Sequence, residues 1–224
     1  MKKIIALLMC LALIFSLAAC SDNNGGDANV TPDADVVDST NENKDESALK
    51  ELSRGSIEGD VYTNDFIGIT FTKGADWTYL SDAEMAQTLN AGQEIMDINT
   101  LEKILSETAT VYDMSVSNTD GTNNVMVLYE NTMLTALKEV TADEYAGYLE
   151  ASLKKVEGQT YTRVSKENVK LGATDFTKLL YSVAVDGVEI SQAYYIKTIG
   201  KYAVAVLVTG LTADDITAME AMFS

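Results

Sequence analysis

Carboxylates are the most abundant chemically active side chains in this 224-residue chain, which has 34 Asp and Glu, 16 Lys and Arg, and no histidine. Without histidine there is no Ser-His or Cys-His nucleophile pair, no histidine zinc ligand and no histidine general base. Adjacent acids at Asp143–Glu144 and Asp214–Asp215 are candidates for acid–base chemistry. Each pair falls in the first turn of an expected helix, where acids favour the helix dipole. Helix capping therefore explains these acids better than catalysis, and we expect no enzyme activity.

Calcium is the metal that suits this composition best, because its ligands are oxygen atoms. The best candidate loop is Asn118–Asn124, but it lacks the acid that opens an EF-hand loop and the Glu that closes one. Its Asp120–Gly121 pair is also what a hairpin turn requires. We therefore expect no metal and no cofactor. The formal charge of -18 argues against nucleic acid, whose phosphates need clustered Lys and Arg.

Eleven tyrosines and one tryptophan are the remaining material for a binding site. Such rings suit a ligand or partner surface because one end is apolar and the other forms hydrogen bonds. Trp77, Tyr194 and Tyr195 are the candidates for this surface. Neighbours on a strand face opposite sides, so Tyr194 and Tyr195 place one ring on each face. Ordinary packing in the core is the alternative explanation for these rings.

Residues 1–19 have the pattern of a signal peptide, with two lysines followed by the apolar stretch Ile4–Leu17. A stable membrane span needs about 20 apolar residues, and this stretch is shorter. The segment ends in Leu-Ala-Ala-Cys at Cys20, which resembles the lipobox of bacterial lipoproteins. The resemblance implies that diacylglycerol is attached to the Cys20 sulfur and palmitate-type chains anchor the protein to the extracytoplasmic face of the cell membrane. The alternative is an ordinary signal peptide with an incidental cysteine.

Two further segments follow the signal peptide. Residues 20–56 contain the only proline and no aromatic residue, so we expect a lipidated cysteine followed by a disordered acidic tether. Residues 57–224 have the length of one domain. The tether carries a net charge of -6 and the body a net charge of -14. An anionic body favours a neutral or cationic partner.

Alternating apolar residues predict eight strands in the body. They are Asp60–Asn64, Phe66–Thr72, Ala109–Ser117, Asn123–Asn131, Tyr161–Lys170, Thr174–Val185, Val188–Thr198 and Tyr202–Thr209. Three helical segments interrupt them: Ser81–Glu107 and the helices that begin after Thr141 and Thr212. Each opens with a hydroxyl residue and has an acid three positions later, as in a capping box. This order predicts an α+β fold with a mostly antiparallel sheet covered by helices on both faces.

The stretches Tyr62–Asn64 and Phe66–Phe71, followed by Trp77, resemble the opening of PsbP-like domains. That family includes an extrinsic subunit of the photosynthetic oxygen-evolving complex and a Ran-binding nuclear import protein. The later stretches Tyr112–Met114 and Asp120–Val125 look like lipoproteins of Gram-positive gut bacteria. The resemblance implies an α-β-α sandwich. It also implies an accessory or binding role, with partners that differ between members.

We therefore expect a non-enzymatic, membrane-anchored protein that binds another protein or a component of the cell envelope. The alternative is a capture module for a small ligand or peptide, associated with a transporter. Typical solute-binding proteins have two lobes, whereas this body has room for one. A hydrolase built from carboxylates alone is the third possibility. The sequence leaves the partner and the oligomeric state open.

Overall fold

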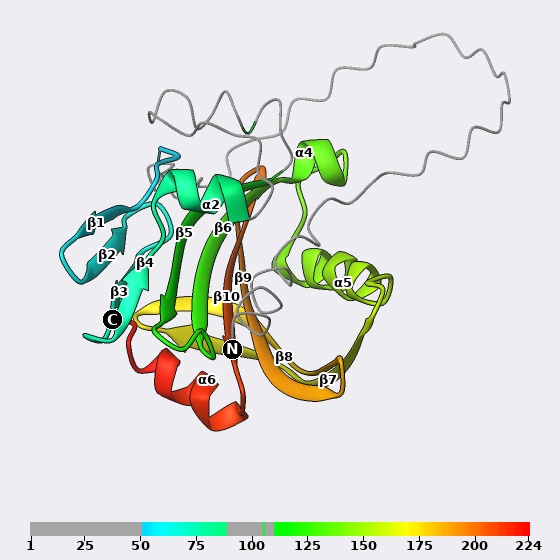
Figure 1. Cartoon of the computed structure of the whole chain (residues 1–224). Helices are drawn as coiled ribbons and strands as arrows, with labels where there is room; N and C mark the ends of the chain where they lie inside the picture. The colour runs from blue at the N-terminus through cyan, green and yellow to red at the C-terminus, as the bar shows by residue number, and fades with distance from the viewer. Residues whose placement is uncertain (1–50, 89–104, 106–109) are drawn as a thin grey trace, which may run out of the picture.

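Two antiparallel sheets form the body of the protein (Figure 1). The computed structural model describes residues 51–88, 105 and 110–224. The larger sheet has the strand order β4-β5-β6-β10-β9-β8-β7, and the smaller has the order β1-β2-β3. The strands of the larger sheet are β4 (Trp77–Tyr79), β5 (Thr110–Asn118), β6 (Asn124–Asn131), β7 (Gln159–Leu171), β8 (Thr174–Val185), β9 (Val188–Ile199) and β10 (Tyr202–Gly210). Those of the smaller sheet are β1 (Ser56–Glu58), β2 (Val61–Asn64) and β3 (Ile69–Thr72).

All eight predicted strands are present, so the mostly antiparallel α+β fold is confirmed. The predicted hairpin around Asp120–Gly121 joins β5 to β6, and Asp186–Gly187 joins β8 to β9. Asp186 and Gly187 both have positive φ angles, 48° and 80°, which is the conformation that makes an Asp-Gly pair suitable for a two-residue turn. Strand β10 lies between β6 and β9, and every one of its residues is buried. Its apolar side chains on both faces predict this central position.

Four helices complete the described part of the chain: α2 (Asp82–Thr88), α4 (Thr132–Thr135), α5 (Ala142–Leu153) and α6 (Ala213–Glu220). Capping boxes begin α5 at Thr141 with Glu144 and α6 at Thr212 with Asp215, as predicted. In each box the hydroxyl accepts from a backbone N–H while the acid accepts from the N–H of the cap residue. These acids are therefore engaged in helix initiation.

The core of the larger sheet is divided between its two faces, as the alternation of side chains along β10 shows. Val204, Val206 and Val208 join one apolar cluster, which includes Ile216 and Met219 of α6. The residues that alternate with them, Ala203, Ala205 and Leu207, join a second cluster. That cluster includes four residues of α5: Tyr145, Ala146, Leu149 and Leu153. The smaller sheet contributes Tyr62, Ile69 and Phe71 to the first cluster, so the two sheets share a core.

Three short elements are not predicted by the sequence pattern: β1, β4 and α4. Strands of three residues are too short to show an alternation, and β4 is held by pairing with the distant β5. Residues before 57 also contact the body. Leu52 packs against the first cluster, and Arg54 and Gly55 bind Asp113 of β5.

Several features of the sequence lie outside the described residues. They include the signal peptide, Cys20, most of the tether, and the greater part of the predicted helical segment Ser81–Glu107. Within the described ranges, no helix has the length and apolar character needed to cross a membrane.

Candidate functional site

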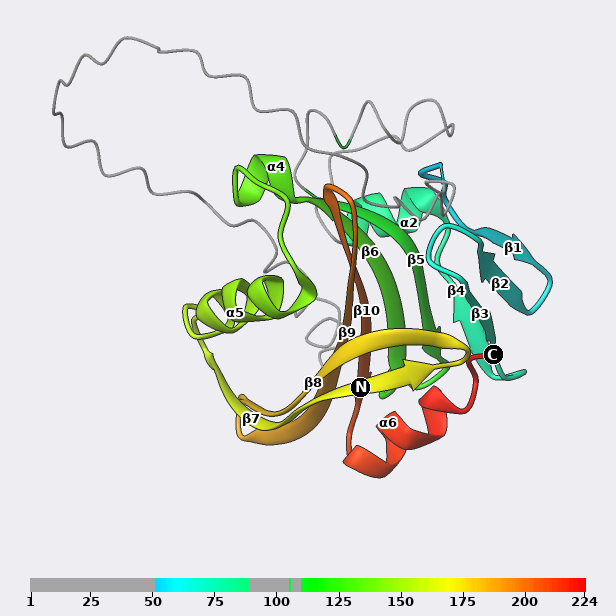
Figure 2. The same ribbon diagram turned by 180° about the vertical axis from the view of Figure 1, so that it is seen from behind.

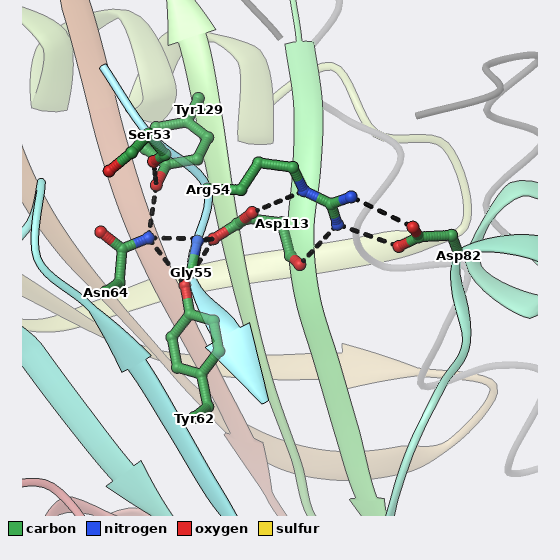
Figure 3. Close-up of polar contacts among 8 residues, drawn as sticks. All are labelled: Ser53, Arg54, Gly55, Tyr62, Asn64, Asp82, Asp113 and Tyr129. Carbon is green, nitrogen blue, oxygen red and sulfur yellow. Dashed lines mark hydrogen bonds and ion pairs between the residues drawn. The ribbon is translucent and has the colours of Figure 1, made fainter. Parts of the chain in front are cut away.

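The buried carboxylate of Asp113 is the centre of a hydrogen-bonded cluster that includes residues 53–55 (Figure 3). Asp113 lies at a β-bulge of β5, where the register with β6 shifts between Tyr112 and Met114. Such a bulge adds one residue to a strand and redirects a side chain. The Asp113 carboxylate consequently reaches the tyrosine and asparagine of β2 from the smaller sheet, and its side chain is fully buried.

Four donors surround the Asp113 carboxylate. Oδ2 accepts hydrogen bonds from the Tyr62 hydroxyl at 2.6 Å, the Asn64 amide at 2.9 Å and the Gly55 backbone N–H at 2.8 Å. Oδ1 accepts from Nε of Arg54 at 3.0 Å. A side chain at Gly55 would collide with the Tyr62 ring, since an added Cβ would lie 2.2 Å from it. Glycine is therefore required for this close approach.

A second layer of contacts connects this cluster to other elements. The guanidinium of Arg54 donates to both carboxylate oxygens of Asp82, at the start of α2, at 2.9 and 3.1 Å. The Tyr129 hydroxyl, on β6, donates to the carbonyl of Ser53 at 2.9 Å. We call Ser53, Arg54, Gly55, Tyr62, Asn64, Asp82, Asp113 and Tyr129 the Asp113 latch.

The Asp113 latch joins distant parts of the chain through ion pairs and hydrogen bonds. Burial, followed by the charge of Asp113, raises the pKa values of Tyr62 and Tyr129 well above their usual range, so both remain protonated donors. Burial acts to lower the pKa of Arg54, but the hydrogen bond to Asp82 and the charge of Asp113 outweigh it and raise that pKa. Each charge therefore already has its partners inside the protein. The latch thus joins residues 53–55 to the body.

A cleft is lined by residues of α5, β7 and β8. Strands β8 and β7 end the larger sheet on the side away from β5, and they curve past α5 in Figure 2. The volume of the cleft is about 350 Å³. The residues that line it come from α5 and the turn after it, from β7 and from β8: Glu150, Leu153, Lys154, Tyr161, Arg163 and Tyr181. We call it the α5–β7–β8 cleft.

Two tyrosine rings and a leucine form the apolar part of this cleft. Tyr161 and Tyr181 meet edge to face, with ring centroids 5.9 Å apart. Tyr181 packs in the same manner on the fully buried ring of Tyr194, again at 5.9 Å. Leu153 is buried in the second core cluster. The cleft wall is thus continuous with the core, which fixes the positions of its rings.

Charged groups form the polar part of the cleft. Arg163 of β7 forms an ion pair with Glu150 of α5, and the Tyr181 hydroxyl donates to the same carboxylate at 3.4 Å. The Arg163 side chain is 49% exposed and that of Glu150 is 27% exposed. Lys154 is exposed and forms no ion pair with any residue that the structure describes. A ligand in the cleft would therefore meet aromatic walls beside accessible charges.

Glu130 is a third unusual group, a carboxyl buried on the α5 side of β6. Its Oε2 accepts a hydrogen bond from the Tyr145 hydroxyl, while Oε1 has no hydrogen-bond partner among the described residues. Burial raises the pKa of Glu130 to about 7, and the hydrogen bond from Tyr145 opposes this shift. In a chain without histidine, Glu130 is therefore a group whose charge changes near neutral pH.

The structure corrects the predicted surface of Trp77, Tyr194 and Tyr195, because all three side chains lie in the interior. Trp77 is 8% exposed and packs edge to face on Phe71, while both tyrosines are 0% exposed. The two tyrosines do face opposite sides of the sheet, as expected. Both sides are covered, however, so neither ring reaches solvent. The Tyr194 hydroxyl donates to Gln192 and that of Tyr195 to Glu220.

The Asn118–Asn124 loop uses its oxygen atoms in its own turn. Asn118 Oδ1 accepts from the Asn123 backbone N–H, and Asp120 Oδ1 accepts from the Thr122 hydroxyl and N–H. The Thr122 hydroxyl and then its N–H lower the pKa of Asp120. Among the described residues, no group of three or more acidic or cysteine side chains is placed to hold a metal ion.

Sequence reasoning missed both the latch and the cleft. One signal was present: the chain has only two arginines, Arg54 and Arg163, and each lies in one of these sites. A second signal was Asp113, the one charged residue of the stretch Val111–Val116.

No family model matches this chain, and no curated protein matches it in sequence. Several solved structures resemble it. The solution structure of cyanobacterial PsbP (CyanoP) from Synechocystis sp. PCC 6803 has 10% identity and a TM-score of 0.45, covering 81% of this chain and 98% of that one. LpqN, involved in cell envelope biogenesis of Mycobacterium tuberculosis, has 10% identity and a TM-score of 0.41, covering 70% and 82%.

A third structure, from Bacteroides thetaiotaomicron VPI-5482, has 16% identity and a TM-score of 0.31, covering 70% of this chain and 44% of that one. A PsbP protein is thus among the structures similar to this chain. All three TM-scores are below 0.5, so neither the fold nor the function of this chain is argued from them. The fold rests on the strand pairing of the chain itself.

Substituting Asp113→Asn should destabilise the protein by about 2–4 kcal/mol. The amide removes the negative charge beside Arg54, and its NH₂ group would face hydrogen-bond donors that the carboxylate now accepts from. The measurement is the free energy of unfolding in urea. Asp82→Asn is the matched control: its side chain is 46% exposed, so we expect a loss below about 1 kcal/mol. Equal losses in the two variants would contradict the central role of Asp113.

Glu130→Gln should remove a pH dependence of stability. The pKa of Glu130 is about 7 in the folded protein against an ordinary value of 4.5, so the folded state keeps a proton that the unfolded chain releases. Wild-type stability should therefore fall as the pH rises from about 5 to about 7. The amide in Glu130→Gln cannot ionise, so the variant lacks this loss. The free energy of unfolding of the variant minus that of wild type should therefore be about 1–3 kcal/mol larger at pH 8 than at pH 5.

Urea unfolding of both proteins at the two pH values measures this effect. Tyr145→Phe is the companion variant, because it removes the hydroxyl that holds the pKa of Glu130 down. It should move the loss of stability to higher pH. An unchanged pH profile in Glu130→Gln would show that this carboxyl does not carry the effect.

Proposed function

We propose that this chain is a non-enzymatic, lipid-anchored extracytoplasmic binding protein whose ligand site is the α5–β7–β8 cleft. The observation that carries the proposal is the cleft itself. A volume of about 350 Å³ lies in the range of small-molecule sites. Such sites combine aromatic walls with a few polar groups that orient the ligand, and the cleft has both.

The choice between the two binding roles follows from this geometry. A protein or envelope component remains a possible partner, but the aromatic residues expected to form its surface are buried. The cleft instead suits a compact ligand or the end of a peptide. We therefore favour the capture of such a ligand, with association with a transporter as one use of it.

The absence of an enzymatic role belongs to the same proposal. The chain has no histidine, and the adjacent acids that suggested acid–base chemistry lie in the first turns of α5 and α6. Glu144 and Asp215, one from each pair, accept hydrogen bonds from capping residues. Glu150, the carboxylate in the cleft, is paired with Arg163.

Lipid anchoring is proposed from the lipobox at Cys20. We also propose the finer form of the fold, an α-β-α sandwich of the PsbP-like kind. Its support is the placement of α5 and α6 in the clusters on opposite faces of β10.

Mass spectrometry of the membrane fraction tests the anchor. The expected result is a chain that begins at Cys20 and carries two acyl chains on a thioether-linked glycerol, because two acyl chains give stable membrane attachment. Cys20→Ser should abolish the modification and release the protein from the membrane. An unmodified chain secreted by wild-type cells would overturn the localisation.

Nuclear magnetic resonance with a fragment collection tests the ligand site. We expect saturable shifts of backbone amides in residues 150–163 and around Tyr181 with at least one class of fragment. Tyr181→Ala, which opens the wall, should reduce them, while Tyr79→Ala on β4 serves as a control outside the cleft. Fragments that shift only amides elsewhere would refute the cleft as the site.

A further inference from the structure

Five basic residues of this acidic body fall in one short segment, which begins at the cleft and includes β7. Residues 57–224 contain 25 acidic and 11 basic side chains. Five of the basic ones fall within residues 154–170, where only Glu157 and Glu167 are acidic. The five are Lys154, Lys155, Arg163, Lys166 and Lys170. A short segment with this balance is a local positive region on a negative protein, which attracts anions.

Not all of these charges are neutralised by the protein. Lys166 pairs with Asp143 at 2.8 Å, and Lys170 pairs with Asp175 at 2.9 Å. Lys154 and Lys155 form no ion pair with the described residues, and Lys154 lines the cleft. The cleft therefore contains two cations, Lys154 and Arg163, against one anion, Glu150.

The Arg163 guanidinium has capacity for a second acceptor. It has five N–H donors, and its hydrogen bond within the described structure goes from Nη1 to Glu150. About half of the Arg163 side chain is exposed. An oxyanion can therefore bind Arg163 without displacing Glu150, and Lys154 supplies the charge that balances it.

The rest of the cleft is apolar. The rings of Tyr161 and Tyr181 and the side chain of Leu153 lie beside these cations. A simple inorganic anion would leave this wall uncovered. An apolar or aromatic group attached to the anion would bury it, with a gain of roughly 25 cal/mol for each Å² removed from water.

We propose that the α5–β7–β8 cleft binds an organic anion, a carboxylate with an apolar or aromatic body, between Lys154 and Arg163 on one side and the tyrosine rings on the other. This inference rests on the proposed function and adds the chemical class of the ligand. A free aromatic carboxylate and the C-terminus of a peptide share this chemistry.

The test compares three probes that differ only in their polar group: 4-phenylbutyrate, 4-phenylbutan-1-ol and 4-phenylbutylamine. Each is titrated into the ¹⁵N-labelled mature chain, residues 20–224, and the amide shifts of residues 150–163 are followed. The carboxylate should bind roughly tenfold or more tightly than the amine, because the cleft is net positive. The alcohol should lie between them.

Two substitutions in the same cleft should change the affinity for 4-phenylbutyrate in opposite directions. Lys154→Gln should weaken it about three- to tenfold, whereas Glu150→Gln should strengthen it, because it removes the one negative charge. Lys155→Gln is the matched control, since Lys155 is adjacent to Lys154 but does not line the cleft. It should alter the affinity less than twofold. Circular dichroism confirms that each variant is folded.

Two further probes distinguish the sources of the anion. Acetyl-Ala-Phe with a free carboxylate should bind more tightly than 4-phenylbutyrate if the ligand is a peptide terminus, and its amide should bind weakly in either case. Equal binding of the carboxylate and the amine, or no effect of Lys154→Gln, would contradict the inference that the ligand is an anion. Either result would still leave the cleft as a ligand site. If no probe shifts the cleft amides, both the inference and the proposed function are wrong.

Discussion

The burial of the Asp113 carboxylate is the constraint on which the joining of the two sheets depends. A carboxylate removed from water is strongly unfavourable unless its hydrogen bonds are replaced. Its donors come from residues 54–55 and from β2, all about 50 or more positions away in the sequence. The charge is therefore satisfied only when the entering segment, the smaller sheet and β5 are assembled together.

Packing around β10 accounts for the burial of the predicted aromatic surface. The side chains on one face of β10 join a cluster with residues of α6 and the smaller sheet, and those on the other face join a cluster with residues of α5, so Tyr194 and Tyr195 of the neighbouring β9 are buried. At the end of α5, an aromatic wall lines the cleft. From Tyr194 through Tyr181 to Tyr161, the rings pass from the core to the cleft in two edge-to-face contacts of 5.9 Å. The cleft is thus an extension of the core, and its shape is set by core packing.

Local patterns predict the strands, the Asp-Gly turns and the capping boxes, because each depends on residues a few positions apart. The latch and the cleft depend on contacts between distant segments. Asp113 contacts β2 because of a β-bulge, and the alternation of apolar residues does not predict that bulge. Arg54 lies in a segment with the composition expected of a tether. Tyr194 and Tyr195 were assigned to opposite faces by alternation, but their burial depends on what packs on those faces. The fold class is therefore readable from the sequence, whereas the site is not.

The two arginines show what separates a structural ion pair from a binding site in this protein. Arg54 donates through Nε and both terminal nitrogens to Asp113 and Asp82, and two carboxylates surround it. Arg163 has one carboxylate partner, a half-exposed side chain and a second cation in the same cleft. The charge of Arg54 is thus paired within the protein. Arg163 and Lys154 instead leave positive charge beside an apolar wall, and this is the basis of the anionic ligand that we propose for a body with a net charge of -14.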